Sequence, residues 1–229
     1  MIINYITRYG SPLQEVLASK LTCFYNKVIL KSKTRLICLL PENVQLHRAE
    51  LHKNMFDELS VVQFNPSNSK FWESFNLNKF SYFVQSISSF SESNHVFIDH
   101  GKIFTRLPEI TNQNIIVCEP QHDNKELMRN VNQILNQYCN RSLLEDEELK
   151  YYDCSLFYIN DELKQWFHAQ LRKIVIDYPE YCDVEKSYAI ISHILSELKS
   201  SQNVIISEIK LEYQDITDSK LIDDFYTLI

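Results

Sequence analysis

Short apolar runs alternate with amphipathic stretches along the whole chain. Seven runs have the length and composition of strands, and they cover residues 2–7, 35–40, 61–64, 95–99, 114–118, 155–159 and 204–209, the last being the final strand expected. Apolar positions at helical spacing predict helices over residues 12–28, 46–59, 67–90, 127–138, 160–174, 183–198 and 221–225. Strands that alternate with helices predict an α/β fold with a mostly parallel central sheet of about seven strands flanked by helices.

Glycine is scarce, and its scarcity excludes several classes of enzyme. Only two of 229 residues are glycine, Gly10 and Gly101, whereas an average chain carries about 7%. Walker A loops, dinucleotide-binding fingerprints and nucleophile elbows each need closely spaced glycines. P-loop kinases, ordinary Rossmann dehydrogenases and α/β-hydrolases are therefore excluded.

Charge, apolar run length and cysteine content limit the partners and the cellular location that we expect. The formal net charge is −7, and without a basic tract the sequence predicts no nucleic-acid partner. No apolar run approaches the roughly 18 residues that span a bilayer, and residues 1–10 lack the order of a signal peptide. We expect no transmembrane segment, a cytoplasmic location, and six scattered cysteines that stay reduced and mostly buried.

Polar residues follow the first predicted strand, where open α/β sheets bind their ligands. The segment Thr7-Arg8-Tyr9-Gly10-Ser11 offers an arginine for a phosphate and a tyrosine that could stack on a base. The alternative is an ordinary turn into a helix.

The fourth predicted strand carries the strongest local signal. It runs into Asp99-His100-Gly101-Lys102, so a carboxylate, an imidazole, the second glycine and a lysine fall in one turn. Asp99 could instead cap a loop or a helix.

Four blocks together resemble a known family. A strand that ends apolar-apolar-Asp-x-small is similar to the DxD region of GT-A-fold glycosyltransferases. Further similarities in the order expected for that family are the opening strand at 2–8, the aromatic strand and Trp-containing helix at 151–166, and the acidic helix start at 183–189. The resemblance covers roughly residues 2–213 and implies a single GT-A-like domain over 1–229. Its nucleotide-binding half would cover about residues 1–120 and its acceptor and sugar half about 121–229.

The resemblance implies roles for particular residues. The donor nucleotide-sugar would meet Thr7, Arg8, Tyr9, Asp99, Gly101 and Lys102 from the first half, and Asp153 and Ser155 from the second. Mn²⁺ or Mg²⁺ is the implied cofactor, with Asp99 as its protein ligand. The second DxD aspartate is replaced by Gly101, which offers the metal no side-chain oxygen, and Asp153 and Ser155 stand where the family has Asn and Gly.

Chemistry would need two further elements. Arg8, Lys102 or a cation would neutralise the departing nucleotide diphosphate. An inverting transferase also needs a carboxylate base near the acceptor hydroxyl, for which Glu185 is the first candidate and Asp183 the second. The alternative is that both acids simply begin a helix, and His193 is expected to be a packed or surface histidine.

Three functions remain open from the sequence. The first is a hexosyltransferase-type enzyme that moves a sugar from a nucleotide-diphosphate donor to a glycan or lipid-linked acceptor, alone or as a homo-oligomer. The second is a catalytically inactive GT-A-like binding or assembly module. The third is a flavodoxin-like regulatory domain, which a mixed sheet of about seven strands with a late antiparallel member would exclude.

Overall fold

The computed structural model describes most of the sheet and the helices of the second half of the chain. The described residues are 1–8, 24, 27, 29–42, 56–64, 83, 94–99, 102–111, 113–120, 123–177, 184–201, 204–210 and 213–215. The chain divides into two compact units. Residues 1–66, 92–110 and 210–229 form the first, and residues 67–91 and 111–209 form the second. The predicted helices at 12–28, 46–59, 67–90 and 221–225 lie mostly or wholly outside the described residues.

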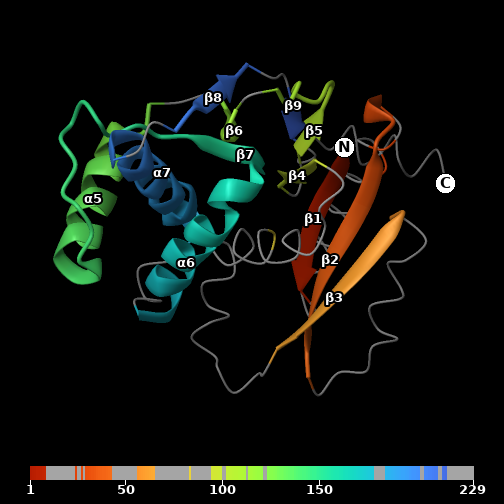
Figure 1. Ribbon diagram of the computed structural model, residues 1–229, viewed down its shortest axis with the longest axis horizontal. Coiled ribbons are helices and arrows are strands. Elements are labelled where there is room, and N and C mark those ends of the chain that lie inside the picture. The colour runs from red at the N-terminus through yellow and green to blue at the C-terminus, as the bar shows by residue number, and fades with distance from the viewer. Residues whose placement is uncertain are drawn as a thin grey trace. The chain divides into compact units, whose positions relative to one another are not determined.

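Four parallel strands form the centre of the first unit. They are β1 (Ile2–Arg8), β2 (Lys33–Pro41), β3 (Glu58–Phe64) and β4 (His95–Ile98), in the order β3-β2-β1-β4 (Figure 1). All four residues of β4 and residues 2–6 of β1 are buried. Burial on both faces explains why these strands read as continuous apolar runs and not as an alternating pattern.

A helical expectation near the start of β3 is wrong. The apolar stripe at 46–59 includes Leu59, which the structure places in β3, opposite Leu36 of β2. Leu59 packs on Cys38, one of the buried residues of β2. The parallel ladder with β2 therefore decides the conformation of this residue, although its spacing in the sequence also fits a helix.

A second, smaller sheet belongs to the first unit as well. The strands β5 (Lys102–Phe104) and β9 (Tyr213–Asp215) pair antiparallel, with Lys102 opposite Asp215. The expectation that residues 204–209 form the last strand is therefore wrong. Both strands have three residues, which is too few for the pattern of apolar positions to indicate them.

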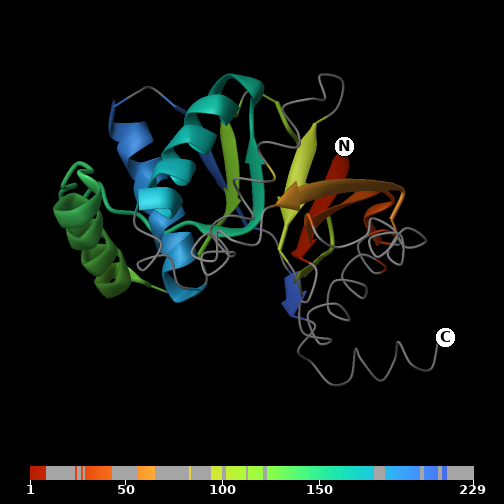
Figure 2. The same cartoon turned by 90° about the horizontal axis from the view of Figure 1, so that it is seen from below.

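The second unit combines three strands with three helices. Its strands are β6 (Ile115–Cys118), β7 (Asp153–Ile159) and β8 (Ile206–Ile209). β6 pairs antiparallel with β7 and parallel with β8. The helices are α5 (Lys125–Cys139), α6 (Asp161–Asp177) and α7 (Val184–Ser201), which gather on one side of these strands (Figure 2).

Local residues explain where these helices begin and end. Asn160 accepts a hydrogen bond from the backbone N–H of Leu163 at 3.2 Å and so caps the start of α6. α5 ends at Asn140, whose φ of 50° places it in the left-handed region that asparagine tolerates. The three helices confirm the predictions at 127–138, 160–174 and 183–198 to within a few residues.

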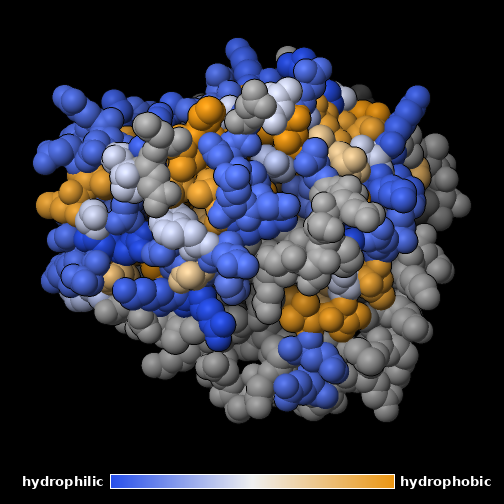
Figure 3. Space-filling view, in the orientation of Figure 1, coloured by the Kyte–Doolittle hydropathy of each residue, from blue (hydrophilic) through white to orange (hydrophobic). Residues whose placement is uncertain are grey.

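Aromatic and aliphatic side chains fill the core of the second unit. Phe157 of β7 stacks on Phe167 of α6 with 5.2 Å between ring centroids, and Phe83 meets Phe157 edge-on at 6.5 Å. Every residue of α7 from Ala189 to Ser196 is buried. Among the described residues on the face seen in Figure 3, hydrophilic ones predominate. Within the described part of the chain, no helix has the length and apolar character needed to cross a membrane.

Seven strands belong to the main sheet, in the order β3-β2-β1-β4 within the first unit and β7-β6-β8 within the second. The predicted fold class, mixed α/β with a mostly parallel, helix-flanked sheet of seven strands, is confirmed. The late antiparallel strand β7 excludes the flavodoxin-like alternative, which requires five strands in simple order. The expected division into halves at about residue 120 stays a prediction.

Candidate functional site

The strand order of the first unit creates a topological switch point between β1 and β4. The chain moves outward from β1 to β2 and β3, and then returns to place β4 on the other side of β1. The register pairs Ile2 with Lys33 on one side and with His95 on the other. In open α/β sheets, ligands bind beyond the carboxyl ends of two such strands. Residues directly after β1 and β4 are therefore the candidates for this site.

Asp99 and Lys102 follow β4 and are joined by a backbone hydrogen bond. The backbone N–H of Lys102 donates to the carbonyl of Asp99 at 3.4 Å, and both side chains are half-buried. Lys102 begins β5, which is held by β9. This pairing fixes the position of Lys102, and it brings Asp215 opposite Lys102. Sequence analysis did not mark Asp215, because a long-range pairing of two three-residue strands leaves no periodic signal.

Asp153 and Ser155 lie at the beginning of β7 in the second unit. Both are buried, with 6% and 1% of their surfaces exposed. The carboxylate oxygen Oδ1 of Asp153 accepts hydrogen bonds from the backbone N–H of Ser155 at 2.8 Å and from its hydroxyl. The two predicted sugar-binding residues thus form one local pair, which compensates part of the cost of burying the carboxylate. Their role toward a sugar stays a prediction.

The remaining predicted residues are described only in part. Thr7 and Arg8 are the last residues of β1, and Glu185 is the second residue of α7, but their side chains lie outside the described residues. Tyr9, Gly101 and Asp183 lie outside them altogether. The structure therefore brings Arg8 and Asp99 to neighbouring strand ends by backbone position, and it leaves the base roles of Glu185 and Asp183 as predictions.

Among the described acids, Asp99 could bind a divalent metal only together with ligands from a substrate. No three His, Cys, Asp or Glu side chains gather as a metal site within the described ranges. A protein cage for Ca²⁺ needs six or more oxygens, whereas Mg²⁺ commonly uses one or two carboxylates together with water and substrate phosphates. Asp99 alone fits the second arrangement, in which a diphosphate supplies most of the ligands.

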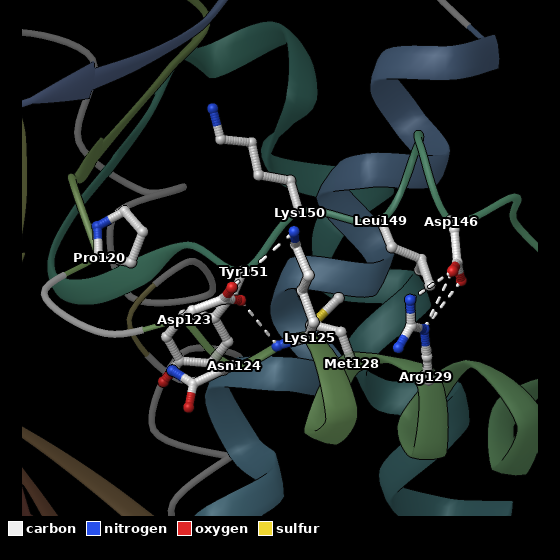
Figure 4. A pocket seen from close by; sticks show the side chains of 10 residues that line it. All are labelled: Pro120, Asp123, Asn124, Lys125, Met128, Arg129, Asp146, Leu149, Lys150 and Tyr151. Atoms are coloured by element: carbon white, nitrogen blue, oxygen red, sulfur yellow. Dashed lines mark hydrogen bonds and ion pairs between the residues drawn. The ribbon is translucent and has the colours of Figure 1, made fainter.

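A separate cavity opens in the second unit. Its volume is about 360 Å³, within the range of roughly 300–1,000 Å³ typical of ligand pockets. It lies beside Pro120, two residues after the end of β6, next to the start of α5 and the segment before β7. Pro120, Met128, Leu149 and the ring of Tyr151 give it apolar surface, and charged side chains complete its lining (Figure 4).

The charges around the cavity are balanced in pairs. Arg129 donates to both carboxylate oxygens of Asp146, at 2.6–3.1 Å. Lys125 and Asp123 approach to 3.8 Å. In Figure 4 the Arg129–Asp146 pair and the Lys125–Asp123 pair lie apart from each other in the lining. Neither pair leaves an unneutralised cluster of positive charge.

Backbone hydrogen bonds to α7 position Tyr151. The hydroxyl of Ser192 bonds both the N–H and the carbonyl of Tyr152, at 2.8 and 3.3 Å, and Ser196 does the same for Lys150, at 3.3 and 3.4 Å. Ser192 and Ser196 are four residues apart in α7 and therefore about 6 Å apart along its axis. This is close to the roughly 6.6 Å between alternate residues of an extended chain, so the two hydroxyls can reach Tyr152 and Lys150 together. Tyr151 lies between the two anchored residues.

Burial also raises the pKa of Tyr151. Loss of water contact raises the pKa of Tyr151 well above the ordinary value near 10, and the nearby acidic groups Cys154 and Asp153 raise it further. Its phenol therefore stays neutral and can both donate and accept a hydrogen bond. Sequence analysis placed Tyr151 in the aromatic block before Asp153, but gave no indication that a cavity forms there.

Comparisons with known proteins give a structural neighbour and no sequence relative. No protein-family model matches the chain, and no curated protein sequence is similar to it. The solved structures with a similar course of the backbone include the crystal structure of mouse xyloside xylosyltransferase 1 in its apo form. The similarity has a TM-score of 0.46 and 5% sequence identity, and it covers 91% of this chain and 83% of the mouse chain.

Proposed function

We propose that the chain is a glycosyltransferase that moves a sugar, a hexose in our proposal, from a nucleotide-diphosphate donor to a glycan or lipid-linked acceptor. The observation that carries this proposal is the position of Asp99. It directly follows β4, which pairs with β1 at the switch point of the sheet. A carboxylate there suits a divalent cation that also binds the two phosphates of a donor.

The neighbouring residues suit the other parts of such a donor. Arg8 and Lys102 supply positive charge where the diphosphate departs, and Tyr9, Thr7 and Gly101 line the nucleotide side. Asp153 and Ser155 would face the transferred sugar. Mn²⁺ or Mg²⁺ would supply charge neutralisation of the diphosphate when bound at Asp99.

The proposed transfer step requires one general base to accept the proton of the acceptor hydroxyl. The acceptor hydroxyl oxygen forms a bond to the anomeric carbon, while the bond from that carbon to the diphosphate oxygen breaks and the diphosphate leaves with the electron pair. In an inverting reaction the hydroxyl proton passes to a carboxylate, Glu185 first and Asp183 second.

Donor binding provides the direct test. Thermal unfolding is followed with UDP-, GDP- and CMP-sugars, with and without Mn²⁺ or Mg²⁺. A donor at a hundred times its dissociation constant should add about 2.7 kcal/mol of stability. We expect Asp99→Asn to remove the metal-dependent part of that gain. The matched control is Glu109→Gln, an exposed acid ten residues further along the same unit, which should retain the full gain.

Two outcomes contradict the proposal in different ways. If no nucleotide-sugar raises the melting temperature or is hydrolysed, donor binding is wrong. If a donor binds equally well to the wild type and to Asp99→Ala, and nothing is transferred, the inactive binding module is the correct alternative. The replacement of the second DxD aspartate by Gly101 is the observation that favours this alternative.

A further inference from the structure

We propose that the cavity bounded by Tyr151, Met128 and the start of α5 is a saccharide-binding subsite. This inference rests on the proposed glycosyl transfer for its biological meaning, and it selects a glycan and not a lipid carrier as the group that the second unit recognises. The cavity's volume of about 360 Å³ places it among ligand pockets.

The mixture of surfaces in the cavity matches the chemistry of a sugar. A pyranose ring presents apolar C–H faces, which pack on an aromatic ring or on aliphatic side chains, and a rim of hydroxyls that donate and accept hydrogen bonds. Tyr151, Pro120 and Leu149 offer the apolar contact above the buried Met128, and Asn124 and Asp123 add an amide and a carboxylate. In Figure 4 these polar groups lie toward the Tyr151 end of the lining.

The charge balance disfavours an anionic ligand. A phosphate or carboxylate group is bound by cationic side chains with free donors. Here the guanidinium of Arg129 is already engaged by Asp146, and Lys150 forms an ion pair with Glu208. Figure 4 shows the Lys150 side chain directed away from the other lining groups. With these cations already paired, the lining presents no cluster of positive charge that would select an anion over a neutral polyhydroxylated ligand.

The aromatic wall is also held in place before a ligand arrives. Ser192 and Ser196 fix the backbone on both sides of Tyr151. The phenol is neutral at neutral pH, as tyrosine ordinarily is, and burial raises its pKa further. A fixed ring loses little conformational entropy on binding, which is the condition for useful affinity from a small contact area.

Methionine provides a direct reporter for the test. The chain has three methionines, Met1, Met55 and Met128, of which Met128 lines the cavity and Met55 lies outside the described residues. The full chain is labelled with ¹³C at the methionine methyl groups, and Met128→Leu assigns its resonance. The probes are methyl α- and β-glycosides of glucose, galactose, mannose and xylose at millimolar concentration. We expect at least one of them to shift the Met128 resonance in a saturable manner while Met1 stays unchanged.

Variants of the lining complete the experiment. Tyr151→Ala should weaken the shift at least tenfold, and Tyr151→Phe should retain most of it because the ring remains. Asp123→Asn should weaken it several-fold without loss of fold, because the amide oxygen can still accept the bond from the Lys125 backbone. Tyr138→Ala, an exposed tyrosine near the other end of α5, is the matched control and should change nothing.

The outcomes separate this inference from the proposed function. If no glycoside moves the Met128 resonance, or if Tyr151→Ala and Asp123→Asn respond as the wild type does, the saccharide subsite is wrong even where a nucleotide-sugar binds at Asp99. If a free nucleotide shifts Met128 and Tyr151→Ala abolishes that shift, the cavity is a nucleotide site and the inference is overturned. A glycoside response that survives Asp99→Asn supports the subsite whether or not donor binding is found.

Discussion

His193 of α7 and Asn132 of α5 are joined by a hydrogen bond of 3.0 Å between Nε2 and Oδ1 inside the second unit. The Asn132 amide is oriented by Leu144, whose N–H donates to Oδ1 at 3.1 Å and whose carbonyl accepts from Nδ2 at 2.9 Å. Because Oδ1 can only accept, the imidazole carries its proton on Nε2. The histidine is fully buried, which confirms that it is a packed residue.

Stability should fall in acid because His193 is buried as the neutral form. Burial lowers its pKa from 6.5 to about 4. The unfolded chain therefore binds a proton more readily than the folded chain between these values, and stability is lost as the pH falls through this window. The loss is about 3 kcal/mol in total. Urea unfolding at several pH values between 7 and 4 measures it.

The His193→Gln variant separates this histidine from other titrating groups. Its stability should be lower at pH 7 but should change less between pH 6.5 and 4 than that of the wild type. The exposed Gln165 of α6 serves as control, since Gln165→Ala removes no titrating group and should leave the acid dependence as it is. An equally steep loss in His193→Gln would contradict the assignment.

Arg141 is a second buried centre of the same unit. Its guanidinium bonds Glu197 of α7 and Gln170 of α6, and its side chain is 8% exposed. Removing one partner of a buried ion pair leaves the other charge uncompensated. Arg141→Ala should therefore lower the free energy of unfolding by about 3 kcal/mol, measured by urea denaturation at pH 7.

The exposed ion pair between Arg129 of α5 and Asp146 provides the control for the stability effect of Arg141→Ala. Arg129 and Asp146 also form a close ion pair, but their side chains are 55% and 62% exposed. Pairs of this kind add little to stability because water and salt screen them. Arg129→Ala should leave the urea midpoint nearly unchanged, and an effect as large as that of Arg141→Ala would show that burial is not the deciding factor.

Ser192 should contribute stability out of proportion to its size. Its hydroxyl is the partner of both the N–H and the carbonyl of Tyr152. Ser192→Ala removes the partner of the buried N–H and leaves the carbonyl only the weak bond from the Cys154 thiol at 3.7 Å, at a cost of about 1–3 kcal/mol. Hydrogen exchange at the Tyr152 amide should accelerate accordingly. Ser201→Ala at the exposed end of α7, where the hydroxyl bonds only the Leu198 carbonyl, should have little effect on either measurement.

Cys38 should resist alkylation in the folded chain. Burial raises its pKa from 9.0 to about 11, so at pH 8 only about one molecule in a thousand carries the reactive thiolate. It is also packed against Leu59 and Val61. Peptide mass spectrometry after iodoacetamide treatment should show slow labelling of Cys38 in buffer and rapid labelling in urea. Equal rates in the two conditions would contradict its burial.

The sequence predicted the elements of the main sheet well and its small partner sheet not at all. Residues 2–6 of β1 and the whole of β4 and β7 are buried, so a continuous apolar run marks each of these strands. β5 and β9 have three residues each, and only their pairing makes them strands. Leu59 was assigned to a helix because its spacing fits two periodicities, and the ladder with β2 decided between them.

The candidate sites differ in the same way. Asp99 was visible in the sequence because a carboxylate directly after a buried run is uncommon, and parallel strands place such residues at one edge of a sheet. The cavity beside Tyr151 was not visible. Its lining comes from the segment after β6, the start of α5 and the segment before β7. No periodic pattern in the sequence indicates that these three segments meet.

The sequence by itself determined the α/β class, the approximate positions of the main-sheet strands and of α5, α6 and α7, and the carboxylate directly after β4. Short-range periodicity is enough for these features, because burial of one face or of both faces acts on neighbouring residues. Only the tertiary structure decided that β9 returns to β5, that Ser192 and Ser196 hold the chain around Tyr151, and that a cavity forms there. These features depend on hydrogen bonds and contacts between distant segments, for which a linear pattern carries no signal.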